Sequence, residues 1–238
     1  MPATEEEWLA ITYGFENKWN FPHAIGTMDG KHVVLESPIN SGNDYDNYKQ
    51  FPSIVLFALV DENYKFLYVN VGSKGRISDG GLFKNTKLYE NLEKRELGIP
   101  SPKILQMPSK TEVPFFILGD EAFQLNENTI KPYEGTPERG SMERIASNES
   151  CLSNNSSIQL FKKKPCKLPA LRTTRIFDTV GNDGERAQGS WRNEPAPTSL
   201  LPLTAIPRRP TIHAKQVRDH LARHFISNGV IAWQNNYQ

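Results

Sequence analysis

The sequence predicts an α/β fold, a mixed sheet with flanking helices, and three observations lead to this prediction. Apolar runs of strand length recur through the first 135 residues, each bounded by turn-forming residues. Two of these runs, in "SIVLFALVDENYKFLYVNVGS", are joined by "DENY", which is typical of a hairpin. Amphipathic helical segments are interspersed with the runs, as an α/β or α+β sheet domain requires.

The first helix is predicted in "TEEEWLAITYGFENKW", where Thr4 can act as the N-cap and acidic residues fill the first turn. Its apolar side chains recur at helical spacing and are Trp8, Ile11, Phe15 and Trp19. The next segment, "HAIGTMDGKHVVLES", reads as a strand because it is apolar and then alternates.

A second helix is predicted over "SDGGLFKNTKLYENLEKREL", with Ser78 or Asp79 as its cap. Its apolar stripe consists of Leu82, Phe83, Leu88 and Leu92. A proline-rich link, "GIPSPKILQMPSKTEVP", then leads to "FFILGDEAFQL", which reads as a short apolar strand that ends at Asp120.

The character of the chain changes after residue 135. Ser, Asn, Pro, Gly and charged residues dominate residues 136–210, which predicts coil or disorder and a truncated or irregular C-terminal part. Order is expected again at "HAKQVRDHLARHFISNGVIAWQ", a helix ended by Asn228-Gly229 with an apolar stripe of Ala214, Val217, Leu221 and Phe225. We therefore expect an N-terminal helix (1–22), a sheet core (23–135), the irregular region (136–210) and a C-terminal helix with its tail (211–238).

Composition narrows the function classes. The 238 residues contain 28 basic and 27 acidic side chains, a net charge of +1, so any nucleic-acid binding must come from a local patch. The only two cysteines, Cys151 and Cys166, do not indicate a disulfide framework or a zinc site. No signal-peptide or membrane-spanning pattern occurs, so we expect a protein of the nucleus or cytoplasm that is not secreted and has no membrane partner.

Asp29 and Asp120 pose the main chemical question. Each carboxylate lies within or at the end of an apolar strand, beside a glycine that permits close approach. If the two strands are neighbours, the carboxylates meet at one edge of the sheet and suit Mg²⁺ or Mn²⁺, which take carboxylate oxygens and leave positions for water and phosphate. The alternative is that both are ordinary turn aspartates at strand ends.

Several blocks together resemble the PIF/Harbinger-type DDE transposase family and its domesticated nuclease relatives. They include "WNFPHAIGTMDGKHVVLESPINSG", "VNVGSKGRISDGGLF" and "VPFFILGDEAFQL", and they extend from Trp8 to Gly135 before the similarity resumes in "GSWRNE" and the C-terminal helix. The resemblance implies an RNase H-like fold and a divalent-metal-dependent DNA endonuclease that cleaves phosphodiester bonds. It also implies that Asp29 is the first catalytic acid and metal ligand, and Asp120 the second.

Further residues carry weaker predictions. Asp79, in "GRISDGGLF", matches another acidic position of the family and is a candidate metal ligand, although it could equally cap a helix. His32 could lie near the metal or face the sheet surface, and Glu121 should point away from Asp120. Four basic side chains could contact phosphates or serve only solvation: Lys31, Lys49, Lys74 and Arg76.

The third acid of the family has no counterpart in its expected place. Counting from Glu143 puts it near Ile158 or Gln159, neither of which is a carboxylate, and Glu143 and Glu149 lie in the wrong place. The sequence therefore predicts weakened or absent strand cleavage, and a sheet left partly uncovered by the lost helix. Two functions stay open: a metal-dependent DNA nuclease, or a non-catalytic domesticated transposase scaffold that binds a protein partner, such as a DNA-binding subunit. A third and lesser possibility is a non-functional gene product, because of the irregular region.

Overall fold

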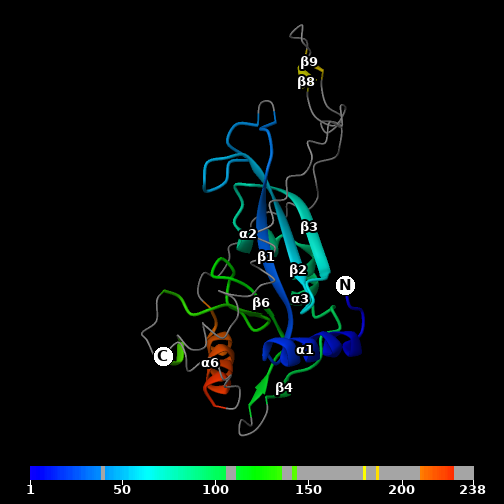
Figure 1. Cartoon of the computed structure of the whole chain (residues 1–238), viewed down its shortest axis with the longest axis vertical. Helices are drawn as coiled ribbons and strands as arrows, with labels where there is room; N and C mark the ends of the chain where they lie inside the picture. The colour runs from blue at the N-terminus through cyan, green and yellow to red at the C-terminus, as the bar shows by residue number, and fades with distance from the viewer. Residues whose placement is uncertain are drawn as a thin grey trace.

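The computed structural model describes residues 1–38, 41–105, 111–135, 141–143, 179–180, 186–187 and 210–227. Its centre is a five-stranded sheet in the order β3-β2-β1-β6-β7 (Figure 1). The strands are β1 (Ala24–Val34), β2 (Ser53–Val60), β3 (Phe66–Lys74), β6 (Phe116–Leu118) and β7 (Thr129–Ile130). β1, β2 and β3 pair antiparallel, whereas β6 pairs parallel with both β1 and β7. The predicted α/β class, a mixed sheet flanked by helices, is confirmed.

The remaining elements surround this sheet. The helices are α1 (Glu5–Trp19), α2 (Asp79–Lys84), α3 (Lys87–Glu93) and α6 (Ile212–Ile226). Two small ladders pair β4 (Lys103–Ile104) with β5 (Glu112–Val113), and β8 (Thr179–Val180) with β9 (Arg186–Ala187). The region 136–210 otherwise lies mostly outside the described residues, as does the predicted helix end at Asn228-Gly229.

The first helix and the hairpin follow their sequence signals. The Thr4 hydroxyl accepts a hydrogen bond from the backbone N–H of Glu7 at 3.3 Å, which caps α1 as predicted. In the β2–β3 turn, Asp61 Oδ1 accepts from the backbone N–H groups of Asn63 and Lys65, both at 2.8 Å. This side-chain hydrogen bonding closes the predicted hairpin.

The prediction of one helix from residue 78 onward is wrong, because the structure has two. Ser78 caps α2 by accepting from the N–H of Gly81, and the helix ends at Asn85. The next residue, Thr86, accepts from the N–H of Tyr89 at 3.1 Å and thereby caps a separate helix, α3. A threonine with its own capping bond is therefore what divides the segment.

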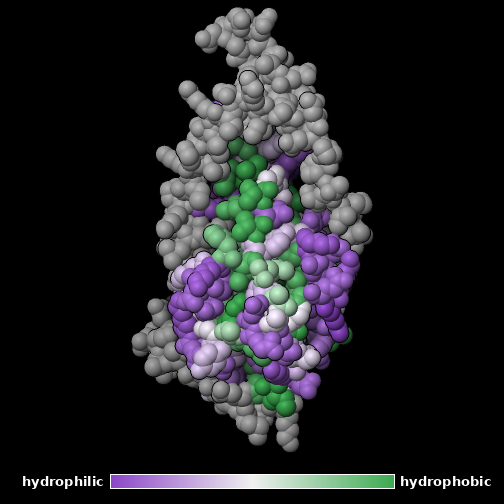
Figure 2. Space-filling view, turned by 90° about the vertical axis from the view of Figure 1, so that its right-hand side faces the viewer, coloured by the Kyte–Doolittle hydropathy of each residue, from purple (hydrophilic) through white to green (hydrophobic). Residues whose placement is uncertain are grey.

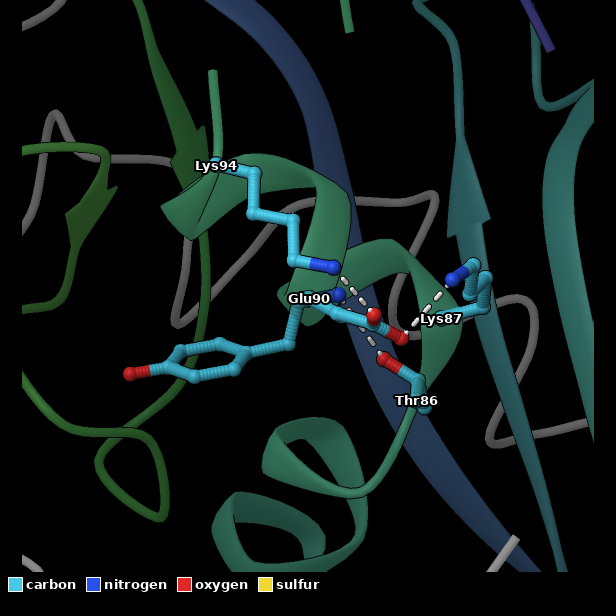
Figure 3. Close-up of polar contacts among 5 residues, drawn as sticks. Thr86, Lys87, Glu90 and Lys94 are labelled. Carbon is cyan, nitrogen blue, oxygen red and sulfur yellow. Dashed lines mark hydrogen bonds and ion pairs between the residues drawn. The ribbon is translucent and has the colours of Figure 1, made fainter. Parts of the chain in front are cut away.

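An exposed ion cluster lies on α3. Glu90 accepts hydrogen bonds from Lys87 at 2.9 Å and from Lys94 at 2.6 Å (Figure 3). These two ammonium groups lower the pKa of Glu90 to about 2, chiefly through the hydrogen bond from Lys94. Pairs three and four residues apart support a helix only modestly when exposed, so the cluster stabilises α3 locally.

The core consists of two apolar clusters. One joins α1, α2 and α3 to the sheet, with Trp8, Met28, Phe57 and Leu82 among its members. The other lies under α6 and contains Phe21, Phe116, Leu118 and Ile130. The predicted apolar stripe of α6 is confirmed, because Ala214, Val217, Leu221 and Phe225 are all buried in this second cluster.

β3 leaves apolar side chains exposed. Phe66 is 58% exposed, Val69 42% and Val71 58%. On the side of the molecule where β3 lies, a stripe of hydrophobic surface runs between two hydrophilic bands (Figure 2). The sheet is therefore incompletely covered at this edge strand. Separately, no helix within the described residues is both long and apolar enough to cross a membrane.

Candidate metal and DNA site

Asp29 lies in the middle of the sheet. It is part of β1, is paired across from Ala58 of β2, and is only 3% exposed. β1 holds it there because the strand runs from Ala24 to Val34 without interruption and has sheet partners on both sides. A carboxylate at this depth needs compensating positive charge or hydrogen bonds to remain ionised.

Asp120 follows β6, the parallel neighbour of β1. Thr27 of β1 is paired with Leu118 of β6, so Asp29 and Asp120 each lie two residues beyond the same paired position. Neighbouring strands are about 4.8 Å apart, and residues two apart on a strand share a face. The strands are neighbours, as the prediction required, and Asp120 follows β6 at the level of Asp29; that the two carboxylates meet stays a prediction.

Asp120 also has a local turn role. It is partly buried, and its Oδ1 accepts a hydrogen bond from the backbone N–H of Ala122 at 2.9 Å. The backbone carbonyl of Asp120 accepts from Phe123 N at 3.2 Å, which completes the turn. The turn-aspartate interpretation therefore describes Asp120 correctly.

Asp79 of α2 lies against β1. A Cβ added at Gly30 would come within 2.5 Å of Asp79 Cγ and closer still to Oδ1. The carboxylate thus lies directly against the backbone of the residue that follows Asp29. Asp79 is the first residue of α2, but the cap itself is Ser78.

Two more glycines close the gap between these elements. A Cβ at Gly80 would come within 2.6 Å of the Ala122 carbonyl oxygen, and one at Gly119 within 3.1 Å of Met28 Cε. Each glycine directly adjoins Asp79 or Asp120 in the sequence. At Gly80 a side chain would meet the backbone of the turn after Asp120, whereas at Gly119 it would meet only the side chains of Phe123 and Met28.

The described residues do not include a complete metal cage. Within them, no group of three or more His, Cys, Asp or Glu side chains is arranged to hold a metal ion. The expected place of the third acid, Ile158 or Gln159, lies outside the described residues, as does Glu149. Glu121 is exposed, as expected for a residue that does not join Asp120.

Glu143 lies elsewhere. Its charge acts on Tyr133, whose pKa is raised mainly by burial and by the hydrogen bond that its hydroxyl donates to Asp219 of α6. The Arg218 guanidinium stacks over the same ring at 3.9 Å. Glu143 is thus associated with the docking of α6 on the sheet domain.

Two of the side chains considered in the sequence, His32 and Lys74, have identified partners. His32 Nδ1 lies 3.0 Å from Ser53 Oγ, and burial together with the Lys49 charge lowers the pKa of His32. Lys74 forms an ion pair with Asp44 at 2.5 Å. These residues lie around the loop 41–52. Its segment "YDNYKQF" combines aromatic and basic residues, which is the sequence signal for this surface.

The comparisons with known proteins agree with this arrangement. A family model described as DDE superfamily endonuclease matches residues 28–159, more than half of the chain. "Protein ALP1-like" of Arabidopsis thaliana is 32% identical over 126 residues, which is 52% of this chain and 30% of that protein. The chain therefore spans less than a third of that relative, and no solved structure matches it significantly. The chain belongs to the DDE superfamily endonucleases, within the PIF/Harbinger-type transposase family.

Proposed function

We propose that the chain is a divalent-metal-dependent DNA endonuclease domain with an RNase H-like fold, in which Asp29 and Asp120 hold Mg²⁺ or Mn²⁺. One observation carries the proposal. Asp29 in β1 and Asp120 just after β6 each lie two residues beyond the Thr27–Leu118 pair of these neighbouring parallel strands. Family membership supplies the substrate class, DNA, and the reaction class, phosphodiester cleavage.

The donor set fits a hard cation. Mg²⁺ binds proteins through one or two carboxylates and completes its shell with water and phosphate oxygens. Asp29 and Asp120 would each offer a carboxylate oxygen, Asp29 from a buried position. The third candidate ligand, Asp79, lies against Gly30, and neighbouring residues of a strand point to opposite faces, so Asp79 would not bind the same ion as Asp29. A bound divalent ion would polarise the phosphate and make water more acidic.

Without a third acid at the family position, we expect metal binding and cleavage to be weakened. Asp29 and Asp120 would still position the cation, because Asp29 is held by its pairing with Ala58 of β2 and Asp120 by its turn. We also propose the domain division at residues 22, 135 and 210, and a nuclear or cytoplasmic location.

Calorimetry with MgCl₂ and MnCl₂ tests the proposal. We expect binding by the parent chain that is lost in both Asp29→Asn and Asp120→Asn, and kept in Asp79→Asn, because Asp79 lies on the other face of β1. Glu121→Gln is the matched control, because Glu121 is an exposed acid next to Asp120. No binding by a folded parent chain, or equal binding by all variants, would overturn the metal site.

A plasmid-nicking assay then tests catalysis. The expected outcome is slow nicking that requires Mn²⁺ or Mg²⁺ and disappears in Asp29→Asn. Nicking that persists in Asp29→Asn indicates a contaminating nuclease or another site, and it contradicts the role of this acid.

A second candidate is a non-catalytic scaffold that binds a protein partner. The exposed apolar side chains of β3, Phe66, Val69 and Val71, favour it, because an uncovered apolar sheet face is a common protein-binding surface. Metal binding without nicking, together with partner binding that is lost in Val69→Lys, would favour this function over the first.

A further inference from the structure

Tyr48 is the most exposed of the large hydrophobic side chains that the structure describes, at 80%. It belongs to the loop 41–52 between β1 and β2, and its ring is not part of either core cluster. Single exposed apolar side chains are common, so the role of this ring depends on what surrounds it.

The loop beneath Tyr48 is held firmly by hydrogen bonds. Asn47 is 5% exposed, and its Oδ1 accepts from the backbone N–H of Lys49 at 2.9 Å. Asn47 Nδ2 donates to Ser53 Oγ at 3.1 Å, and Ser53 N donates to the Tyr45 carbonyl at 2.9 Å. The residues on either side of Tyr48 are therefore anchored to the start of β2.

Two nitrogen-bearing side chains flank the ring. The His32 ring from β1 meets Tyr48 edge to face, with centroids 5.9 Å apart, and the Lys49 ammonium lies 5.4 Å from the Tyr48 centroid. Lys49 is exposed. The solvent-exposed ring of Tyr48 is therefore a flat π-surface with a cation beside it.

A second pair of the same kind lies in the same loop. The Lys74 ammonium from β3 is 5.8 Å from the Tyr45 ring centroid, although its ion pair with Asp44 offsets part of its charge. Arg76 is close enough to help lower the pKa of Asp44, after the larger effect of Lys74. Residues from β1, β3 and the loop thus place aromatic and basic groups side by side.

We propose that this surface binds an unpaired DNA nucleotide, with the base stacked on Tyr48 and the phosphates beside Lys49. Aromatic side chains stack on bases of any sequence, and neighbouring cations neutralise the backbone. A base in an intact duplex has both faces covered, so the preferred substrate is DNA with a single-stranded segment. The inference rests on the proposed DNA endonuclease function and specifies its substrate class.

The position of Tyr48 relative to the proposed acids follows from β1. His32, which contacts the Tyr48 ring, follows Asp29 by three residues, about 10 Å along the strand, and this odd offset points the two side chains to opposite faces of the sheet. The surface at Tyr48 is therefore a binding surface separate from the Asp29 carboxylate. A protein ligand is a poorer match, because the exposed ring is bordered by ammonium and imidazole groups rather than by apolar side chains.

Fluorescence anisotropy with a labelled oligo-dT and with a blunt duplex of equal length, both in EDTA, tests the inference. We expect the full chain to bind the single strand more tightly. Tyr48→Ala should weaken that binding by about five- to a hundredfold, whereas Tyr48→Phe keeps it. Lys49→Ala should reduce the dependence of the affinity on salt. Tyr13→Ala is the matched control, because Tyr13 is a 68% exposed tyrosine on α1.

Three outcomes overturn the inference: no binding of the single strand, tighter binding of the duplex, or equal loss in Tyr48→Ala and Tyr13→Ala. The absence of metal in this assay separates it from cleavage. If Tyr48-dependent binding is found but nicking is not, the substrate site stands and the endonuclease function fails. If nicking is found but Tyr48→Ala binds the single strand normally, the endonuclease function stands and the substrate site at Tyr48 fails.

Discussion

Replacing Gly80 by alanine tests the packing that brings α2 to the proposed acids. The new Cβ would lie 2.6 Å from the Ala122 carbonyl oxygen, whereas ordinary contact begins at 3.4 Å. The helix or the turn that follows Asp120 must therefore move by 3.4 − 2.6 = 0.8 Å. The obstacle is backbone and cannot rotate away, so we expect an overpacking cost of about 1–3 kcal/mol.

Gly81→Ala is the matched control in the same helix turn. Its Cβ would meet Ser78 Oγ at 3.1 Å and Ile77 Cγ1 at 3.5 Å, and Ser78 can yield by a few tenths of an ångström. Both substitutions gain up to about 1 kcal/mol of helix propensity, so this contribution cancels between them. Gly80→Ala should therefore be less stable than Gly81→Ala by about 1–3 kcal/mol.

Urea unfolding at 25 °C, followed by tryptophan fluorescence, measures the free energy of unfolding of each variant. Equal stability of the two alanine variants would refute the reasoning, because it would mean that Gly80 is not in contact with the Ala122 backbone. A lower stability of Gly80→Ala together with weaker Mn²⁺ binding would link this contact to the site.

Three further predictions concern stability. Trp8→Phe removes the indole N–H that donates to the Leu97 carbonyl at 2.7 Å, and the buried acceptor left behind should cost about 1–3 kcal/mol in urea unfolding. Thr86→Ala removes the cap of α3 and should cost about 1–2 kcal/mol, whereas Thr86→Ser keeps most of it. Burial lowers the pKa of His23 in the folded state, against the opposing hydrogen bond to Val113 O. Unfolded chains then bind more protons than folded ones just below the unfolded value of about 6.5, so stability should fall as the pH drops through 6.5. His23→Asn, which tolerates the φ of +62°, should flatten this slope in thermal melts at pH 5.5–7.5.

The sequence predicted the elements whose local signals agree with their packing. Thr4 marked the start of α1, and alternating apolar residues on each side of "DENY" marked the β2–β3 hairpin. The break between α2 and α3 was missed because Leu82 and Leu88 enter the same core cluster, so the apolar spacing continues across the break. The capping side chain of Thr86 was the signal that could have revealed it.

The candidate site was predictable in part. The sequence predicted that Asp29 and Asp120 meet if their strands are neighbours, and β1 and β6 are neighbours in the sheet. Strand order itself is a tertiary property, and so is the contact of Asp79 with Gly30. The short strands β4 and β5 have only two residues each, too few to show any periodicity.

The packing position of α6 affects how the protein folds during its synthesis. The Phe21 and Phe225 rings lie 4.9 Å apart in one core cluster, although β7 and α6 are separated by roughly 80 residues of chain. At about 5–20 residues per second, a ribosome adds α6 on the order of 4–16 s after it completes β7. During that interval Phe21 and Phe116 lack the cover of α6, so the nascent sheet exposes apolar surface to chaperones and to neighbouring chains. Weaker induction, which lowers the number of such chains present at one time, should therefore raise the soluble yield.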